Sequence, residues 1–364
     1  MFSFSVETRS RRARAGRLVT PHGALDTPAF MPVGTAGAVK AVTARDLRDV
    51  GAQIVLANTY HLMLRPGDAL VAELGGLHRF TPWRGPWLTD SGGYQVMSLA
   101  KLRRLDENGV TFRSHLDGTE HVLTPERSMQ VQMNLGADVV MAFDECPMLP
   151  APREAVAVAA ERTTRWAERS RRAHHRADQW LFGIVQGGVD AELRARSARE
   201  IVALGFPGHA IGGLAVGEAK PDTMRVVAQM DGLLPEEKPR YLMGVGTPED
   251  LVEAVARGID LFDCVLPTRN ARNGQLFTRE GRLSIRNARH RADERPPDPG
   301  CPCPTCATAS RAYLRHLHLA GEMSAATLMT VHNLFYYLDT LRNMRQSILL
   351  GRFEEFRAEM LRAL

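Results

Sequence analysis

The sequence lacks any apolar run as long as the ~20 residues that a membrane-spanning helix requires. Its arginine-rich beginning, Arg9–Arg17, has no apolar segment behind it, so we expect no secretory signal and a cytoplasmic location. Internal repeats and low-complexity tracts are missing too. With 44% hydrophobic and 24% charged residues, the composition is that of an ordinary globular protein with no membrane partner.

Positive charge is only slightly in excess over negative charge. The formal net charge is +5 and the pI is near 9.1, a balance that permits a polyanionic partner without requiring one. Arginines are nevertheless concentrated in Arg162–Arg176 and in Arg282–Arg295. A long solvated helix explains the first group, whereas the second extends positive charge into an insertion described below.

Cysteine is scarce as well. Five residues are an odd number, and three of them lie within Cys301-Pro-Cys303-Pro-Thr-Cys306. In a cytosolic chain this pattern indicates metal binding and not disulfide bonds. The other two, Cys146 and Cys264, lie in apolar surroundings and are predicted to be packed in the core.

The cysteine cluster needs a fourth ligand. His332 lies in a predicted helix that would pin the inserted segment to the end of the chain, but His316 and His318 are nearer in sequence. Three thiolates and one imidazole, with no position left for water, are typical of a structural Zn²⁺ site. We therefore predict one structural zinc ion per subunit, bound by Cys301, Cys303, Cys306 and His332.

Short apolar runs alternate with helical patterns along most of the chain, which predicts an α/β fold with a parallel sheet. The count of eight strands favours a (β/α)8 TIM barrel over a doubly wound sheet. At 364 residues the chain exceeds the roughly 250 typical of such a barrel. The predicted strands are Ala29–Val33, Ala52–Asn58, Trp87–Asp90, Asp138–Asp144, Trp180–Gln186, Ala210–Leu214, Tyr241–Val245 and Leu261–Leu266, and the helices between them include Pro66–Leu74, Arg153–Ala177, Ala191–Leu204, Thr223–Met230 and Pro248–Arg257.

Two segments interrupt this alternation within a predicted single domain of residues 1–364. In the first, about 94–124, Asp117-Gly118 between Ser114–Leu116 and His121–Leu123 predicts a β-hairpin, followed by a helix at Pro125–Asn134. The second, about 273–332, is rich in Arg and Pro and contains the cysteine cluster. Helices within 333–364 are expected to close the barrel.

Four of the predicted strands end in a polar side chain: Asp90, Asp144, Gln186 and Asp263. Barrel enzymes place their catalytic groups at the carboxyl ends of the strands, so the four are expected to meet at one rim. A helix cap explains any one of them alone. Four polar ends at one rim favour a catalytic site.

Neighbouring residues suit a planar or anionic ligand. Gly92-Gly93 and Gly212-Gly213 allow close approach of the backbone. Thr247, Pro248 and Asp250 predict a capped helix start whose N–H groups suit a phosphate, although simple capping explains them equally well. A basic loop with Thr268, Arg269 and Arg272 follows Asp263.

Taken together, these segments resemble the bacterial queuine tRNA-ribosyltransferases, also called tRNA-guanine transglycosylases. The resemblance spans nearly the whole chain in order, and its most specific parts are Phe262–Arg269 and the metal pattern. The other matching segments are Thr89–Gln95, Ala142–Pro147, Phe182–Gly188, Ala210–Glu218, Met243–Glu249 and Arg272–Gln275.

The resemblance implies a pentosyltransferase of queuosine biosynthesis. Such an enzyme exchanges guanine 34 in the anticodon loop of tRNAs with GUN anticodons for 7-aminomethyl-7-deazaguanine (preQ1), and it acts as a homodimer. Asp263 would be the nucleophile at ribose C1′ and Asp90 the general acid/base. The base would contact Ser91, Gly92, Gly93, Tyr94, Asp144, Gln186, Gly213, Leu214 and Met243, and the RNA would contact Gly244, Val245, Gly246, Thr247, Pro248, Glu249, Asp250, Thr268, Arg269, Asn270, Ala271 and Arg272.

Three relatives of this family are the alternatives. A non-catalytic RNA-binding subunit is disfavoured because both Asp90 and Asp263 are present. An archaeal-type enzyme is expected to carry further RNA-binding domains after the zinc region. A eukaryotic catalytic subunit that uses queuine directly is harder to separate, although Val216 beside Leu214 resembles the bacterial pocket.

Overall fold

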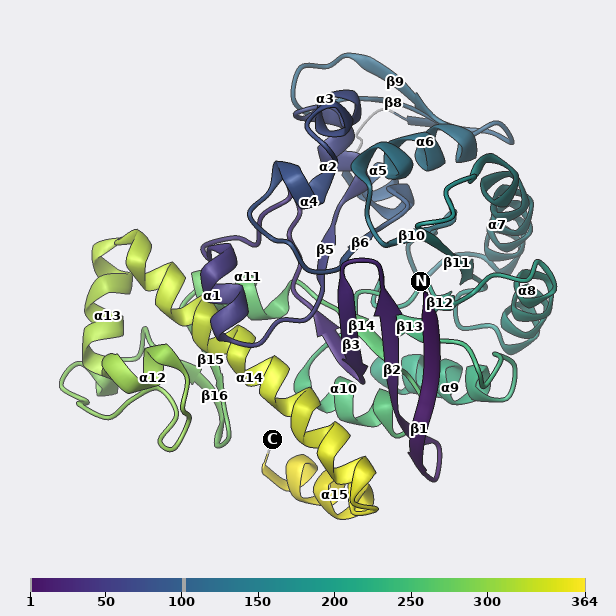
Figure 1. Ribbon diagram of the computed structural model, residues 1–364. Helices are drawn as coiled ribbons and strands as arrows, with labels where there is room; N and C mark the ends of the chain where they lie inside the picture. The colour runs from purple at the N-terminus through teal and green to yellow at the C-terminus, as the bar shows by residue number, and fades with distance from the viewer. Residues whose placement is uncertain (1, 100–102, 364) are drawn as a thin grey trace.

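The computed structural model describes residues 2–99 and 103–363. Its centre is a sheet of eight parallel strands in the spatial order β4-β14-β13-β12-β11-β10-β6-β5. A parallel bridge between Val33 and Leu56 joins the two edges, so the predicted barrel is confirmed (Figure 1). The strands are β4 (Ala29–Met31), β5 (Val55–Ala57), β6 (Trp87–Thr89), β10 (Val139–Met141), β11 (Trp180–Val185), β12 (His209–Ile211), β13 (Arg240–Leu242) and β14 (Leu261–Asp263).

Alternate side chains of the strands serve two cores. Val139 and Met141 of β10 belong to the cluster inside the barrel, whereas Val140 packs with the cluster under the surrounding helices. Burial on both faces explains why the strands are nearly continuous apolar runs. The surrounding helices are α1 (Ala44–Asp49), α2 (Thr59–Leu64), α3 (Asp68–Glu73), α4 (Leu77–Phe80), α6 (Pro125–Leu135), α7 (Arg153–Ala173), α8 (Ala191–Ala203), α9 (Lys220–Asp231), α10 (Pro248–Val255) and α11 (Leu266–Arg272).

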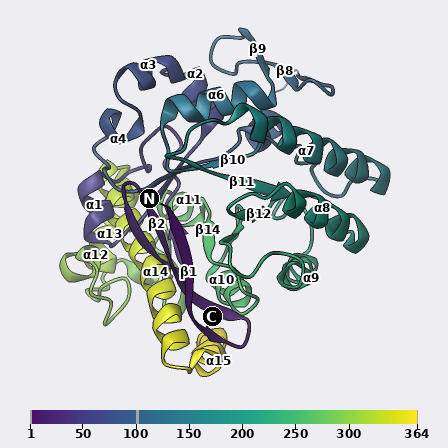
Figure 2. The same ribbon diagram turned by 45° about the vertical axis from the view of Figure 1, so that its right-hand side comes forward.

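A three-stranded antiparallel sheet precedes the barrel and was not predicted. It consists of β1 (Ser3–Ser10), β2 (Ala13–Thr20) and β3 (Gly23–Thr27). Leu18 and Leu25 join the cluster inside the barrel, so this sheet covers one mouth of the barrel, and β1 and β2 cross in front of it in Figure 2.

The segment predicted as a hairpin contains three strands in the described residues: β7 (Arg103–Leu105), β8 (Val110–Arg113) and β9 (Glu120–Leu123). The turn at Asp117-Gly118 is present, but the strand predicted at Ser114–Leu116 is wrong. Ser114 instead closes the turn, since its N–H donates to Thr119 and its carbonyl accepts from Gly118. Helix α5 (Gly93–Leu99) begins the segment, and residues 100–102 lie outside the described residues, as do Met1 and Leu364.

The second predicted insertion forms a lobe beside the barrel (Figure 1). Its small apolar core includes Leu276, Leu283, Leu314 and Leu317. The lobe contains β15 (Gln275–Thr278), β16 (Gly281–Ser284), η1 (Ala288–His290), α12 (Pro304–Thr308) and α13 (Arg311–Ala320), and it leads into α14 (Met323–Leu349) and α15 (Phe353–Ala363). Within residues 2–99 and 103–363, none of the helices combines the length and the apolar character needed to cross a bilayer.

Candidate active site

Asp90, Asp144, Gln186 and Asp263 all lie at the carboxyl ends of barrel strands. Asp90 and Gln186 directly follow β6 and β11, Asp263 is the last residue of β14, and Asp144 lies just beyond β10. Asp90, Asp144 and Gln186 are buried, and Asp263 is half-buried. The fold therefore brings these four side chains to one rim, where barrel enzymes have their active sites.

Asp263 is held through one of its two carboxylate oxygens. The Tyr241 hydroxyl donates to Oδ1 at 2.6 Å, and the Gly244 N–H donates to the same atom at 2.7 Å. Among the described residues, none donates a hydrogen bond to Oδ2. Burial raises the pKa of Asp263, and the bonds from Tyr241 and Gly244 oppose that rise. The side chain is thus oriented while one oxygen remains available for bonding.

Asp90 has a more enclosed environment. The Thr59 N–H donates to its Oδ1 at 2.8 Å, Gln95 Nε2 donates to Oδ2 at 2.8 Å, and Asn58 Nδ2 also donates to Oδ2. Burial raises the pKa of Asp90 to about 6, against the bonds from Asn58 and Thr59 and with a further contribution from the charge of Asp263. A carboxyl group that titrates near neutral pH can both donate and accept a proton.

The coupling between these two carboxylates gives a prediction. Asp263→Asn removes a nearby negative charge, so we expect the pKa of Asp90 to fall from about 6 while burial keeps it above the ordinary aspartate value. In each protein Asp90 is protonated below its own pKa and ionised above it, so the variant should lose the proton at a lower pH than the wild type. Titration of the ¹³C-labelled carboxyl resonance in both proteins measures the shift, and an unchanged midpoint would contradict the coupling.

Asp144 and Gln186 form a second buried polar pair. Gln186 Nε2 donates to Asp144 Oδ2 at 2.7 Å, and the Ser91 hydroxyl donates to Oδ1 at 2.7 Å. Burial raises the pKa of Asp144. Gln186 Oε1 is buried and has no hydrogen-bond partner within the described part of the chain. A buried acceptor of this kind needs an N–H or O–H donor.

Glycines leave room beside this pair. A Cβ on Gly93 would lie 2.4 Å from the Asp144 carbonyl oxygen, and one on Gly213 would lie 2.2 Å from Gln186 Oε1. Gly213 also has a φ of 63°, which favours glycine. Of the other residues predicted to contact a base, Leu214 and Gly92 are buried, Met243 is half-buried and Tyr94 is 41% exposed.

Arg194 of α8 is a site residue that the sequence analysis missed. Its side chain is fully buried, and it donates to the carbonyls of Val185 at 2.8 Å, Gly188 at 2.7 Å and Gly213 at 3.3 Å. The guanidinium thereby connects the loops that follow β11 and β12. The sequence did contain a signal for it: Arg194 lies on the apolar face of the predicted helix with Ala198 and Ile201, where a charged residue is unusual.

Replacing Arg194 with Met should therefore loosen both loops. The alkyl part of the cavity stays filled, but the carbonyls of Gly188 and Gly213 lose their donor, each at a cost of about 1–3 kcal/mol. The Val185 carbonyl keeps its bond from the Gly212 N–H. We expect a lower Tm and, for the base that the resemblance implies as substrate, a KM at least about tenfold higher than in the wild type. A variant with wild-type KM would show that Arg194 does not position the loops, and Arg199→Met on the same helix is the matched control.

The segments predicted to contact RNA lie at the start of α10 and along α11. The predicted cap of α10 is confirmed, since Asp250 Oδ2 accepts from the Thr247 N–H at 2.9 Å and from its hydroxyl at 2.8 Å. Lys220 Nζ lies 3.1 Å from Asp250 Oδ1 and adds a positive charge that the sequence analysis did not single out. Thr268–Arg272, predicted as a loop, belongs to α11, because Pro267 near its start favours a helix.

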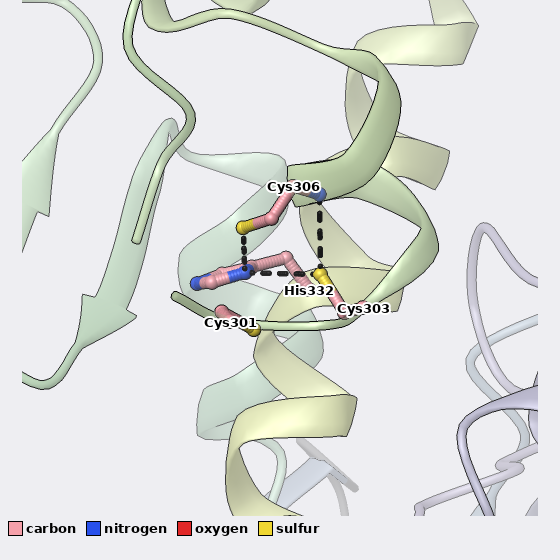
Figure 3. Close-up of side chains that lie close together, drawn as sticks. All are labelled: Cys301, Cys303, Cys306 and His332. Carbon is pink, nitrogen blue, oxygen red and sulfur yellow. Dashed lines mark hydrogen bonds between the residues drawn. The ribbon is translucent and has the colours of Figure 1, made fainter. Parts of the chain in front are cut away.

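The cysteine cluster is brought together with His332 of α14 (Figure 3). His332 Nδ1 lies 3.4 Å from Cys303 Sγ and 3.3 Å from Cys306 Sγ, and the four ligand atoms, including Cys301 Sγ, are within 4.8 Å of one another. His332 Nε2 faces the Phe277 carbonyl oxygen at 2.8 Å, which leaves Nδ1 for a metal. This donor set fits a metal ion, whereas His318 instead contacts Arg286.

A parallel barrel with a polar, partly buried carboxylate rim defines an enzyme of the TIM-barrel class. Comparison with known proteins identifies the family. The model of the family described as queuine tRNA-ribosyltransferase matches residues 9–364. The chain therefore belongs to the queuine tRNA-ribosyltransferase family, an enzyme family, as the resemblance implied.

Individual relatives cover almost the whole chain. A queuine tRNA-ribosyltransferase of Thermus thermophilus is 57% identical over 361 residues, which are 99% of this chain and 94% of the relative. Proteins of the same name from Pelotomaculum thermopropionicum and Moorella thermoacetica are 55% and 56% identical, covering 99% and 98% of this chain and 98% and 96% of the relatives.

Proposed function

We propose that this chain is a tRNA-guanine transglycosylase of queuosine biosynthesis. It exchanges guanine 34 of tRNAs with GUN anticodons for preQ1 by double displacement through a covalent Asp263–RNA intermediate. The observation that carries the proposal is the pair of rim carboxylates. Asp263 keeps Oδ2 available for bonding, and Asp90 has a pKa of about 6.

The reaction follows from these two environments. Asp263 Oδ2 forms a bond to ribose C1′ as the bond from C1′ to guanine breaks, and Asp90 gives its proton to the departing base. The incoming base then loses a proton to Asp90 and attacks C1′, which releases Asp263. Two displacements retain the configuration at C1′, as in retaining glycosidases, and no nucleotide cofactor is consumed.

The pocket residues fit a base with guanine-like edges. Gln186 Oε1 is a buried acceptor without a partner in the described residues, and Asp144 supplies further acceptor oxygens beside it. We propose that N–H groups of the base bind there, with Ser91, Gly92, Gly93, Gly213 and Leu214 around it and Tyr94 and Met243 against its faces. The target base has to leave the anticodon stack to reach this depth.

We assign the RNA backbone to the start of α10 and to α11, which directly follows Asp263 and the end of β14. We propose contacts from Gly244–Asp250 and from Thr268–Arg272. Lys220, together with exposed Arg269, supplies positive charge for phosphates.

We also propose that the chain works in the cytoplasm as a homodimer. Tyr313 of α13 and Met323 at the start of α14, 50% and 87% exposed, offer apolar surface to a second copy.

The Cys3His cluster is proposed to hold one Zn²⁺ ion per subunit. Three sulfur ligands and one nitrogen ligand are the donor set of structural zinc, and four protein ligands leave no position for a reacting water. Bound zinc would cross-link the lobe to α14. It supplies no chemistry to the exchange reaction.

The test of the function is incorporation of radiolabelled guanine into an unmodified tRNA with a U-G-U anticodon loop. A transcript in which guanine 34 is replaced by adenine is the control. We expect incorporation into the first only, and its displacement by preQ1 more effectively than by queuine. Incorporation into both transcripts would exclude position 34, and stronger displacement by queuine would favour the eukaryotic type of substrate.

A further inference from the structure

A second cluster of possible metal ligands lies at the end of the barrel opposite to the carboxylate rim. It consists of His22, His78 and Asp138, whose ligand atoms are within 4.8 Å of one another. Asp138 immediately precedes β10 at its amino end, His22 lies in the turn between β2 and β3, and His78 belongs to α4. Three segments distant in sequence therefore converge on one carboxylate.

The carboxylate is fixed and the two imidazoles face it. Asp138 is buried, and its Oδ2 accepts from the Trp87 N–H at 2.9 Å, which anchors it to β6. His22 Nδ1 lies 2.8 Å from Oδ1, and His78 Nε2 lies 3.1 Å from Oδ2. Ligand atoms of a tetrahedral zinc site are about 3.3 Å apart, close to both of these nitrogen–oxygen separations, so reorientation of the imidazoles would convert this cluster into a coordination site.

The solvent exposure of His22 permits the side-chain movement that coordination requires. The His22 side chain is 40% exposed, so an ion can reach the carboxylate from solvent. The two imidazole rings are stacked with their centroids 3.4 Å apart, and they have to fan out to share an ion. His22 has room to do so at the surface, and water can complete the coordination.

A comparison within the same end of the barrel shows what is unusual about the cluster. Asp260 precedes β14 just as Asp138 precedes β10, and it too accepts a backbone N–H, from Arg240 at 2.7 Å. Its partner in the N-terminal sheet is Arg14, 2.8 Å away at Nε, which is permanently charged and binds no metal. The partners of Asp138 are instead the imidazoles of His22 and His78. Imidazole, unlike guanidinium, is a common metal ligand.

We propose that His22, His78 and Asp138 bind a divalent transition-metal ion of the zinc type, separate from the ion of the cysteine cluster. The bound ion connects the turn between β2 and β3 to α4 and to the start of β10. It thus attaches the N-terminal sheet to the mouth of the barrel at the amino ends of the strands. The ion pair of Arg14 and Asp260 attaches the same sheet at a second point. The site is structural, because it lies at the opposite end from the carboxylate rim.

Cobalt titration of the purified full-length protein, with zinc retained in the cysteine cluster, tests this proposal. We expect one added Co²⁺ per chain, with visible absorption but without the intense sulfur-to-cobalt band that a cysteine site would give. In His22→Ala the affinity for this added ion should fall at least about tenfold, because one of three protein ligands is lost. His175→Ala, which removes another exposed histidine, is the matched control and should bind Co²⁺ like the wild type.

A thermal measurement accompanies the titration. Added Zn²⁺ should raise the Tm of the wild type and of His175→Ala but not that of His22→Ala. Guanine exchange by His22→Ala should stay at the wild-type level, which shows that the variant is folded. Failure of the wild type to take up an added ion, or equal uptake by His22→Ala, would overturn the proposal.

Discussion

Asp263→Asn should reduce guanine exchange by at least about a thousandfold and abolish the covalent RNA adduct. The amide has nearly the same shape as the carboxylate, so its Oδ1 can still accept from Tyr241 and Gly244. What it lacks is the negative charge and the nucleophilic oxygen that attack C1′. The rate of radiolabelled guanine incorporation measures the first effect, and a denaturing gel of the adduct trapped with a base analogue measures the second.

The control for this prediction is Asp222→Asn. It makes the same chemical change on α9, where Asp222 pairs with Arg225 at 2.7 Å and is 43% exposed. We expect wild-type exchange and wild-type adduct formation from this variant. If Asp263→Asn formed the adduct at the wild-type level, another group would have to be the nucleophile and the proposed mechanism would be wrong.

The sequence predicted the barrel because its physical cause is visible in the residues. Strands buried on both faces must be apolar throughout, and a polar residue that ends such a run stands out. Asp90, Asp144, Gln186 and Asp263 were found in this way, and the structure places all four at one rim, although β10 ends before Asp144. The bonds that decide their chemistry, such as Tyr241 to Asp263, join neighbouring strands and depend on the closed barrel.

The N-terminal sheet was not predicted, because its strands lack the continuous apolar runs that mark the barrel strands. Along β1 the exposed residues alternate with half-buried ones, and β2 carries Arg14 and Arg17 among small residues. Its burial comes from covering the barrel mouth and not from a long apolar face of its own. Arg14 is buried against Asp260 and the carbonyls of Glu236 and Lys238, all far away in sequence. A pairing of this kind has no local pattern.

Arg194 and α11 illustrate two further limits. An arginine on the apolar stripe of a helix signals that something is unusual, but the three carbonyls that it contacts become neighbours only in the folded barrel. For α11, a short polar segment after a strand has weak helical periodicity. Burial of its Ala271 in the apolar core of the lobe, which also contains Leu276 and Leu314, stabilises the helix.

His332→Ala should remove the proposed zinc and unfold the lobe around it, whereas His318→Ala should do neither. His332 is fully buried, with Nδ1 toward Cys303 and Cys306, so its loss leaves three thiols and an open position. Binding of a structural metal is coupled to folding, and its loss is expected to cost several kcal/mol. His318 was the nearer candidate in sequence, but it lies beside Arg286, away from the cysteines.

Metal content by mass spectrometry and limited proteolysis measure these outcomes. In His332→Ala we expect about one zinc fewer per chain than in the wild type and rapid cleavage between β15 and α13. In His318→Ala the zinc content and the cleavage pattern should match those of the wild type. Full zinc retention by His332→Ala would mean that another residue is the fourth ligand. Loss of zinc without new cleavage would mean that the core around Leu276, Leu283 and Leu314 holds the lobe together without the metal.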